Sequence, residues 1–225
     1  MFRIKVCGVT RLSDAADIAA AGADAIGLNF YERSPRCVTA NDAEALATAV
    51  KGGPLVVGVF VNATADWVTQ VANQVPLGAI QLHGDEPPEF AASLPSDLPV
   101  IRAFRIDDRG LEPAAQHVEE CRKRRPLDAV LLDAAVTPAE GEPQAYGGTG
   151  ERLDWAGVGR ERGVFGSLPV ILAGGLRPRN VARAIELSGA DGVDTASGVE
   201  SSPGVKDADR VRRFVEAAKT GFAAR

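Results

Sequence analysis

The chain has 225 residues, of which 45% are hydrophobic and 24% are charged, and its formal net charge at pH 7 is -5. The length suits one compact α/β domain spanning residues 1–225, and the negative charge argues against a general nucleic-acid binder, which usually carries a basic face. The three cysteines form neither a disulfide framework nor a metal-ligand pattern, no apolar run approaches a membrane span, and residues 1–5 are too short and too charged for a signal peptide. We therefore expect a cytoplasmic protein without a metal.

Eight short apolar runs, each bounded by Gly, Pro or Asp, have the pattern of buried parallel strands. They cover residues 3–6, 25–29, 55–61, 79–82, 100–104, 129–132, 170–172 and 192–194. Ala-rich stretches with helical spacing lie between most of them, so about eight helices are expected. Eight such units in this length, without a linker or a low-complexity segment, favour a (β/α)8 TIM barrel over a doubly wound sheet.

Capping residues and prolines indicate where the helices begin. Ser13, Asn41 and Thr64 each stand before acidic residues, as N-caps do. Pro113, Pro178 and the pair 87–88 fall where further helices should start. The basic run 122–125 is expected at the C-terminal end of a helix, where cations are favoured, and His117 is expected at the surface.

Most of the unusual residues follow the predicted strands, where the active face of such a barrel lies. Cys7 ends the first apolar run and Asp133 ends the sixth. A thiol and a carboxyl at two strand ends suggest a base and an acid that face one substrate. The sequence contains no dinucleotide fingerprint, no P-loop and no metal cluster, so we expect chemistry by side chains alone, without a cofactor.

Two Gly-rich elements predict a phosphate site. Gly174 and Gly175 follow the seventh run, and Ser197 and Gly198 follow the eighth, which is where barrels commonly bind phosphate. The alternative is a pair of tight turns without a ligand. A third Gly-rich segment, 146–150, lies in a long connection after Asp133 and suggests a mobile lid that also helps to hold phosphate.

Two other side chains at strand ends leave their roles open. Arg36, held in a turn by Pro35, suits a bidentate grip on a carboxylate, although a pair of arginines in a loop can equally be solvated charge. His83 follows the fourth run, and its position allows a base, a phosphate partner or a structural hydrogen-bonding group.

Several motifs occur in order along nearly the whole chain, and together they resemble the phosphoribosylanthranilate isomerase family of tryptophan biosynthesis. The motifs are Lys5-Val6-Cys7-Gly8-Val9-Thr10, Ser34-Pro35-Arg36, Gly58-Val59-Phe60-Val61-Asn62, Gln81-Leu82-His83-Gly84-Asp85-Glu86, Leu131-Leu132-Asp133, Gly147-Gly148-Thr149-Gly150, Leu172-Ala173-Gly174-Gly175-Leu176 and Ser197-Gly198-Val199-Glu200. The resemblance implies a cofactor-free Amadori rearrangement of a phosphorylated small molecule. It implies no nucleic-acid or membrane partner, and either a monomer or a homodimer.

The resemblance also implies roles for individual residues. Cys7 would be the general base, Asp133 the general acid, and Arg36 the group that binds the anthranilate carboxylate. The remaining candidates for substrate binding, mostly through the phosphate, are His83, Gly148, Gly174, Gly175, Asp194, Ser197 and Gly198.

One residue departs from the family pattern. Where the family usually carries Asp-Val-Ser-Ser-Gly, this chain has Asp194-Thr195-Ala196-Ser197-Gly198, so Ala196 lacks a hydroxyl. The loss should be small if backbone N–H groups provide most of the phosphate binding, and larger if that hydroxyl contributes.

The proposed roles require an unusual order of protonation. A free aspartic acid has a pKa of about 4 and a free cysteine one of about 8.5, so the site must raise the first and lower the second. Lys5 shares a strand face with Cys7 and is our hypothesis for the group that holds the thiolate. The alternatives are the related histidine-pathway isomerase, in which an aspartate replaces this cysteine, and a non-catalytic phosphate-binding barrel.

Overall fold

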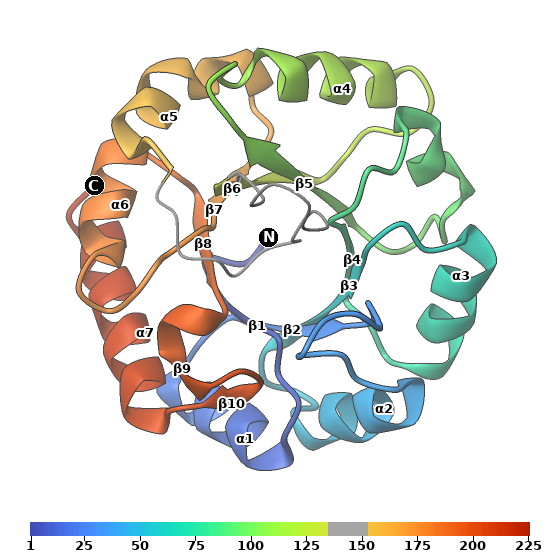
Figure 1. Ribbon diagram of the computed structural model, residues 1–225, viewed down its shortest axis with the longest axis vertical. Coiled ribbons are helices and arrows are strands. Elements are labelled where there is room, and N and C mark those ends of the chain that lie inside the picture. The colour runs from blue at the N-terminus through green and yellow to red at the C-terminus, as the bar shows by residue number, and fades with distance from the viewer. Residues whose placement is uncertain (135–152) are drawn as a thin grey trace, which may run out of the picture.

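The computed structural model describes residues 1–134 and 153–225. Eight parallel strands close into one barrel in the order β1 to β8, as Figure 1 shows from above. The strands are β1 (Ile4–Cys7), β2 (Ala25–Asn29), β3 (Leu55–Phe60), β4 (Ala79–Leu82), β5 (Val100–Ile106), β6 (Ala129–Ala134), β7 (Val170–Leu172) and β8 (Gly192–Thr195). The predicted TIM barrel is confirmed, and so are all eight predicted strands, with ends shifted by two residues at most.

Helices form a ring outside the barrel, and the largest core cluster lies between the two layers. The α-helices are α1 (Leu12–Ala21), α2 (Ala40–Ala49), α3 (Ala65–Gln74), α4 (Glu112–Arg122), α5 (Trp155–Glu161), α6 (Val181–Ser188) and α7 (Ala208–Ala223), and the 3-10 helices are η1 (Pro88–Ser93), η2 (Arg162–Phe165) and η3 (Ser197–Val199). Among the described residues, no helix is both long enough and apolar enough to cross a lipid bilayer.

The predicted helix starts are confirmed only in part. Thr64 caps α3, since its side chain accepts a hydrogen bond from the Trp67 N–H. The prediction that Asn41 caps α2 was wrong, because Thr39 caps this helix by accepting a hydrogen bond from the Asp42 N–H. The prediction that Ser13 caps a helix was also wrong, because Ser13 lies inside α1 and its hydroxyl donates to the Asp14 carboxylate. The proline pair 87–88 starts a 3-10 helix rather than an α-helix.

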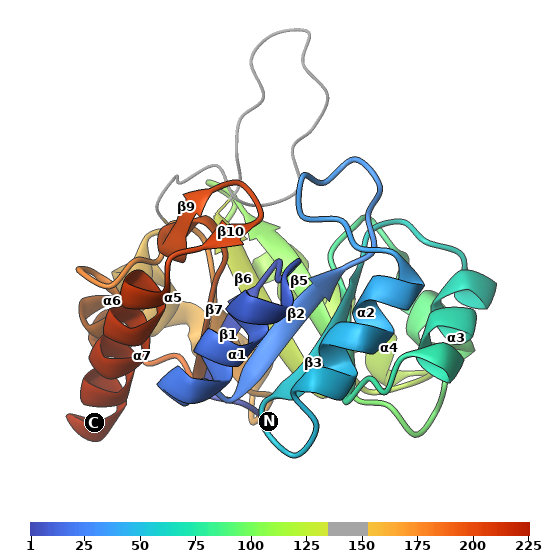
Figure 2. The ribbon, with the colours of Figure 1, turned by 90° about the horizontal axis from the view of Figure 1, so that it is seen from below.

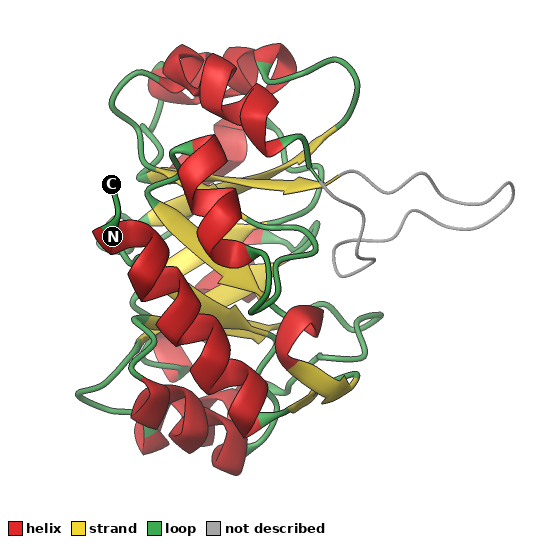
Figure 3. Cartoon of the chain, turned by 90° about the vertical axis from the view of Figure 1, so that its left-hand side faces the viewer, coloured by secondary structure: helices red, strands yellow, loops and turns green. Residues whose placement is uncertain are grey.

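A small antiparallel hairpin follows β8 and lies outside the barrel sheet. It consists of β9 (Glu200–Ser202) and β10 (Val205–Lys206). Figures 2 and 3 show it at the end of the barrel opposite the chain termini, which is the end where the strands finish. The hairpin therefore stands at the edge of the barrel mouth.

Every second residue of each strand faces the inside of the barrel, and its character changes along the axis. The inner cluster toward the bottom is apolar and comprises Phe2, Ala25, Val57, Ala79, Ile101, Ala103, Ala129, Leu131, Ile171 and Ala173. Closer to the C-terminal ends of the strands the interior contains polar side chains, with Lys5, Gln81, Asp133 and Asp194 all buried. The apolar layers thus support a polar layer at the mouth.

Candidate active site

A cavity opens at the C-terminal end of the barrel and contains most of the candidate residues. Its lining residues are Cys7, Gly8, Asn29, Ser34, Arg36, Val59, His83, Asp133, Ala173, Gly174, Gly175, Leu176, Asp194, Thr195, Ala196, Ser197 and Gly198. Nine of the ten predicted site residues are among them. The tenth, Gly148, lies outside the described residues, as does the Gly-rich segment that suggested a lid.

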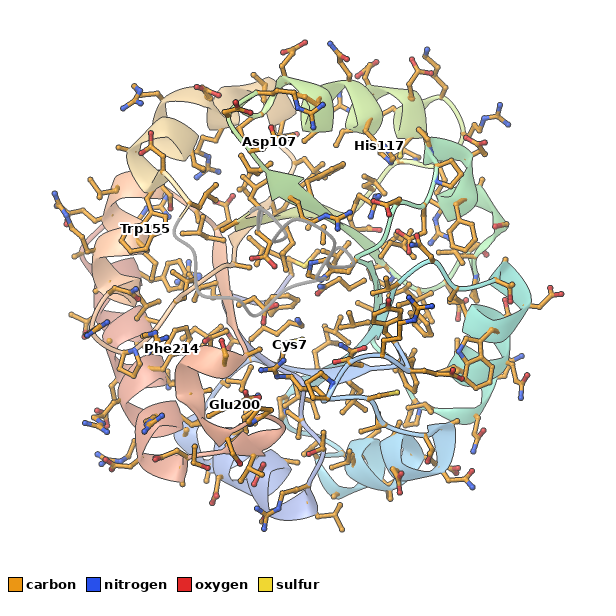
Figure 4. The ribbon with its side chains drawn as sticks, viewed as in Figure 1. Cys7, Asp107, His117, Trp155, Glu200 and Phe214 are labelled. Carbon is orange, nitrogen blue, oxygen red and sulfur yellow. The ribbon has the colours of Figure 1, made fainter. Side chains whose placement is uncertain are left out.

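Cys7 ends β1 inside the ring of strands, as Figure 4 shows. Its space depends on Gly27 in the neighbouring strand: a Cβ there would lie 2.6 Å from Cys7 Sγ and 3.1 Å from Lys5 Cε. The next residue, Gly8, has φ +71°, and a Cβ on it would lie 2.4 Å from Arg36 Cδ. The two glycines therefore allow the thiol and the arginine to meet in one cavity.

Lys5 and Asp194 form a buried ion pair next to Cys7. The register of β1 and β8 puts them side by side, and Lys5 Nζ lies 2.8 Å from Asp194 Oδ2. Burial alone would lower the pKa of Lys5, but the Asp194 carboxylate raises it, so the ammonium stays charged. Asp194 Oδ1 is buried and has no hydrogen-bond partner among the described residues.

The pKa of Cys7 does not shift in the expected direction. Burial raises the pKa of the thiol above its ordinary value; the charge of Lys5 opposes this rise and that of Asp194 adds to it. Lys5 therefore lowers the pKa of the thiol, as the hypothesis expected. The net shift of the Cys7 pKa is nevertheless upward, because burial has the larger effect.

Asp133, on the opposite side of the mouth, has His83 as its neighbour. His83 Nε2 lies 3.4 Å from Asp133 Oδ2, and the Gln81 side-chain amide nitrogen lies 3.1 Å from His83 Nδ1. With the Gln81 amide nitrogen as the donor, Nδ1 accepts and the ring proton is on Nε2, which faces the carboxylate but makes no hydrogen bond among the described residues. Of the three roles left open for His83, this geometry favours the hydrogen-bonding one.

The two Gly-rich loops after β7 and β8 pack against each other. A Cβ on Gly198 would lie 1.8 Å from the Leu176 carbonyl oxygen, so only glycine fits there. The Thr195 hydroxyl donates to that same carbonyl at 2.8 Å. Gly174, with φ +80°, leaves room for the acid, since a Cβ would lie 2.8 Å from Asp133 Oδ1. The loops thus form one continuous wall beside the acid.

Arg36 reaches the cavity from the loop after β2 and is held by a carboxylate of the protein itself. Its Nε and Nη2 donate to the two carboxylate oxygens of Glu200 at 2.8 and 2.7 Å. Lys206 Nζ donates to Glu200 Oε1 at 2.7 Å and to the Cys7 carbonyl oxygen at 2.7 Å. Burial would raise the pKa of Glu200, but Arg36 and Lys206 lower it below its ordinary value.

Several residues of this site were not predicted from the sequence. Because every second residue of a strand points to the same face, Asn29 shares a face with Gly27, and Gln81 shares one with His83. This alternation could have predicted both residues from the sequence. Strand parity could not have found Glu200 and Lys206, because they reach the mouth from the hairpin after β8. Within the residues that the structure describes, no group of three or more His, Cys, Asp or Glu side chains could hold a metal ion.

Known proteins that are similar to this chain share one enzyme description. A family model described as N-(5'phosphoribosyl)anthranilate (PRA) isomerase matches residues 4–217. The N-(5'-phosphoribosyl)anthranilate isomerase of Myxococcus xanthus is 46% identical over 219 residues, covering 97% of this chain and 96% of that protein.

Two solved structures have the same fold. One is a phosphoribosyl anthranilate isomerase in complex with reduced 1-(o-carboxyphenylamino)-1-deoxyribulose 5-phosphate; its TM-score is 0.81 and its identity 34%, with 98% of this chain and 100% of that chain covered. The other is described as mutually generated monomers of the dimeric enzyme from Thermotoga maritima, with a TM-score of 0.79, 32% identity and the same coverage.

Proposed function

The chain belongs to the N-(5'-phosphoribosyl)anthranilate isomerase family of tryptophan biosynthesis, and we propose that Cys7 and Asp133 are the general base and general acid of its reaction. The substrate is N-(5-phosphoribosyl)anthranilate, and the product is 1-(2-carboxyphenylamino)-1-deoxyribulose 5-phosphate. The observation that carries the assignment is the pair of strand ends: Cys7 on β1 and Asp133 on β6 line one cavity from opposite sides.

The order of strands around the mouth supports one orientation of the substrate. From β6 to β2 the cavity presents Asp133, the loop of Gly174 and Gly175, the loop of Ser197 and Gly198, Cys7, and finally Arg36. The phosphate would lie over β7 and β8 on backbone N–H groups, and the anthranilate carboxylate would lie near Arg36. The ribose then spans the distance between the acid and the base.

The reaction needs two proton transfers. Asp133 donates a proton to the ribose ring oxygen, and the ring opens to an imine between C1 and the anthranilate nitrogen. Cys7, as the thiolate, removes the proton from C2 to give an enolamine. The enolamine then gains a proton at C1 and loses the proton of its 2-hydroxyl group, which gives the ketone.

The raised pKa of Cys7 fits a base that ionises during the reaction. Before ring opening, burial favours the neutral thiol. The ring-opened imine carries a positive charge when it is protonated on nitrogen, and that nitrogen is bonded to C1, next to the carbon that loses its proton. Because a nearby cation lowers the pKa of a thiol, the Cys7 thiolate would be most populated at the step that uses it.

His83 would orient the carboxyl group of the general acid, Asp133. Its Nε2–H faces Asp133, and Gln81 fixes the ring from the other side, so the imidazole can hold the carboxyl in one orientation. This would leave proton donation itself to Asp133.

The test is the loss of anthranilate-type fluorescence as substrate is consumed, measured for the wild type and for Cys7→Ser and Asp133→Asn. Each variant should lose about two or more orders of magnitude in kcat while still binding the reduced product. Cys37→Ser is the matched control, because Cys37 is a half-buried thiol that does not line the cavity. Near-normal turnover of either site variant would refute its assignment.

The same assay separates the alternative functions. A histidine-pathway isomerase would leave the fluorescence unchanged and turn over its own phosphosugar, and a non-catalytic barrel would bind the reduced product without any turnover. The oligomeric state, monomer or homodimer, stays a prediction that light scattering on the purified protein would decide.

A further inference from the structure

We propose that Glu200 is a positioning residue that acts through Arg36 and gives the site its selectivity for a substrate with an aromatic carboxylate. The proposal rests on the proposed function, in which Arg36 binds that carboxylate. Figure 4 shows Cys7 within the ring of strands and Glu200 beside it on the β9 side.

The geometry of the Arg36 guanidinium group supports this role. Glu200 takes the edge formed by Nε and Nη2, and both of its carboxylate oxygens are used. Among the described residues, Arg36 Nη1 has no hydrogen-bond partner, so the edge formed by Nη1 and the second N–H of Nη2 is the one left for a ligand. A guanidinium has five N–H donors in a fixed plane, so holding one edge fixes the direction of the other.

The charge of the groups around Arg36 also supports this role. A carboxylate placed beside Arg36 would normally cancel the charge that attracts an anionic ligand. Here Lys206 also binds Glu200, at 2.7 Å, so the group of Arg36, Glu200 and Lys206 carries a net charge of one positive unit. The side chains of Glu200 and Lys206 are 4% and 1% exposed, whereas that of Arg36 is 14% exposed and lines the cavity. The group therefore suits a single carboxylate that approaches Arg36.

Arg36 is also held rigidly by its neighbours. A free arginine loses considerable rotamer entropy when a ligand fixes it, and this cost lowers affinity. The stem of Arg36 packs on Gly8, its backbone N–H donates to the Ser34 hydroxyl at 3.1 Å, and its head is held by Glu200. The Gly204 N–H also donates to Glu200 Oε1 at 3.3 Å. The β9–β10 hairpin thus orders the arginine before the ligand arrives.

The experiment compares two analogues of the product. One is the reduced product with its carboxylate, and the other is the same molecule with an unsubstituted phenyl ring. The quantity measured is the ratio of their Kd values, by calorimetry, for the wild type, Glu200→Gln, Arg36→Met and Glu86→Gln. Glu86 is the matched control, because it also forms a buried ion pair, with Arg102, and does not line the cavity.

We expect Glu200→Gln to weaken binding of the carboxylated analogue by about tenfold or more, and that of the phenyl analogue by less than about twofold. KM should rise with little change in kcat. Glu86→Gln should leave the ratio unchanged, whatever it does to stability. A Glu200 that served only to fold the hairpin would weaken both analogues alike, and that result would overturn the proposal.

Arg36→Met separates this inference from the assignment beneath it. If Arg36→Met loses the preference for the carboxylate and Glu200→Gln keeps it, the positioning role is wrong and the role of Arg36 stands. If Arg36→Met keeps the preference, the assignment of Arg36 fails, and the inference fails with it. Should Glu200→Gln not fold, Glu200→Asp keeps the charge but shortens the reach by one methylene, and an unchanged ratio in that variant would also refute the proposal.

Discussion

Lys5 and Asp194 form an ion pair inside the barrel next to the thiol of Cys7, with Lys5 Nζ donating to Asp194 Oδ2 at 2.8 Å. Both residues are buried, and the cation opposes the upward shift of the Cys7 pKa. One buried ammonium therefore acts on two groups, the carboxylate that it neutralises and the thiol whose ionisation it favours.

Replacing Lys5 by Met should have two separate effects. The variant leaves Asp194 buried and unpaired, which should lower the free energy of unfolding by about 3–5 kcal/mol. The pKa of Cys7 should rise further, so its alkylation by iodoacetamide at a fixed alkaline pH should become slower. The measurement is the alkylation rate against pH in a Cys37→Ser, Cys121→Ser background, where Cys7 is the only thiol.

Two further variants make this prediction specific. Lys123→Met removes the same side chain from an exposed pair with Glu120 and should change neither quantity. The double variant Lys5→Met, Asp194→Asn should regain part of the lost stability, because no unpaired buried charge remains. An alkylation midpoint that Lys5→Met does not move would contradict the role of Lys5 toward the thiol.

Gly198→Ala should damage the contact between the two Gly-rich loops. The new Cβ would lie 1.8 Å from the Leu176 carbonyl oxygen, so one loop must move. We expect a loss of about 1–3 kcal/mol in the free energy of unfolding and a higher KM for the phosphorylated substrate. Gly163→Ala is the control, because nothing lies within 4 Å of the position of its added Cβ. Urea unfolding and steady-state kinetics measure both quantities, and similar results for the two variants would contradict the packing argument.

Ala196→Ser restores the hydroxyl that the family usually carries. Ala196 lies between Thr195 and the loop of Ser197 and Gly198, and it lines the cavity. If backbone N–H groups provide most of the phosphate binding, KM should fall by less than about threefold, which is within the net value of one hydrogen bond. A much larger fall would mean that a side-chain hydroxyl is a main phosphate ligand in relatives that carry it.

His117 should make the stability of the protein sensitive to mild acid. The imidazole packs against the Phe104 ring at 5.3 Å between centroids and is half-buried, so the prediction of a surface residue was wrong. Figure 4 places it on α4 in the outer ring. Burial, together with the charge of Arg102, lowers the pKa of His117 to about 4 from its ordinary 6.5.

The sign of this effect follows from the proton count. Between about pH 6.5 and pH 4 the unfolded chain binds a proton at His117 that the folded chain does not, so stability is lost as the pH falls through this window and is fully present above it. Relative to His117→Gln, the wild type should lose on the order of 1 to 2 kcal/mol across the window, measured by urea unfolding at several pH values. If the free energy of unfolding changed equally with pH in both proteins, the lowered pKa of His117 would be contradicted.

The sequence was sufficient for the barrel and for residues that end its strands. Short apolar runs bounded by Gly, Pro or Asp predicted all eight strands, and Cys7, His83 and Asp133 follow directly from that pattern. Local capping was less reliable, since Thr39 and Asn41 are both good caps and only the observed backbone distinguishes them.

Pairs that are far apart in the sequence could not be found in this way. Lys5 meets Asp194 only because the first and last strands of the barrel are neighbours in a fixed register. Glu200 meets Arg36 across 164 residues through a hairpin that is not part of the barrel sheet. The upward shift of the Cys7 pKa depends on burial by the closed barrel, which no local pattern reports.

The closure of the barrel also sets an order of events. Lys5 is separated by 189 residues from Asp194, and Cys7 by 199 from Lys206, whose ammonium binds its carbonyl oxygen. Contacts this distant in sequence form late, after local helices and neighbouring strands. Almost the whole chain must therefore be synthesised before the thiol in the first strand gains these neighbours. Recovery of activity after unfolding should report completed closure of the barrel, and not the earlier return of helix.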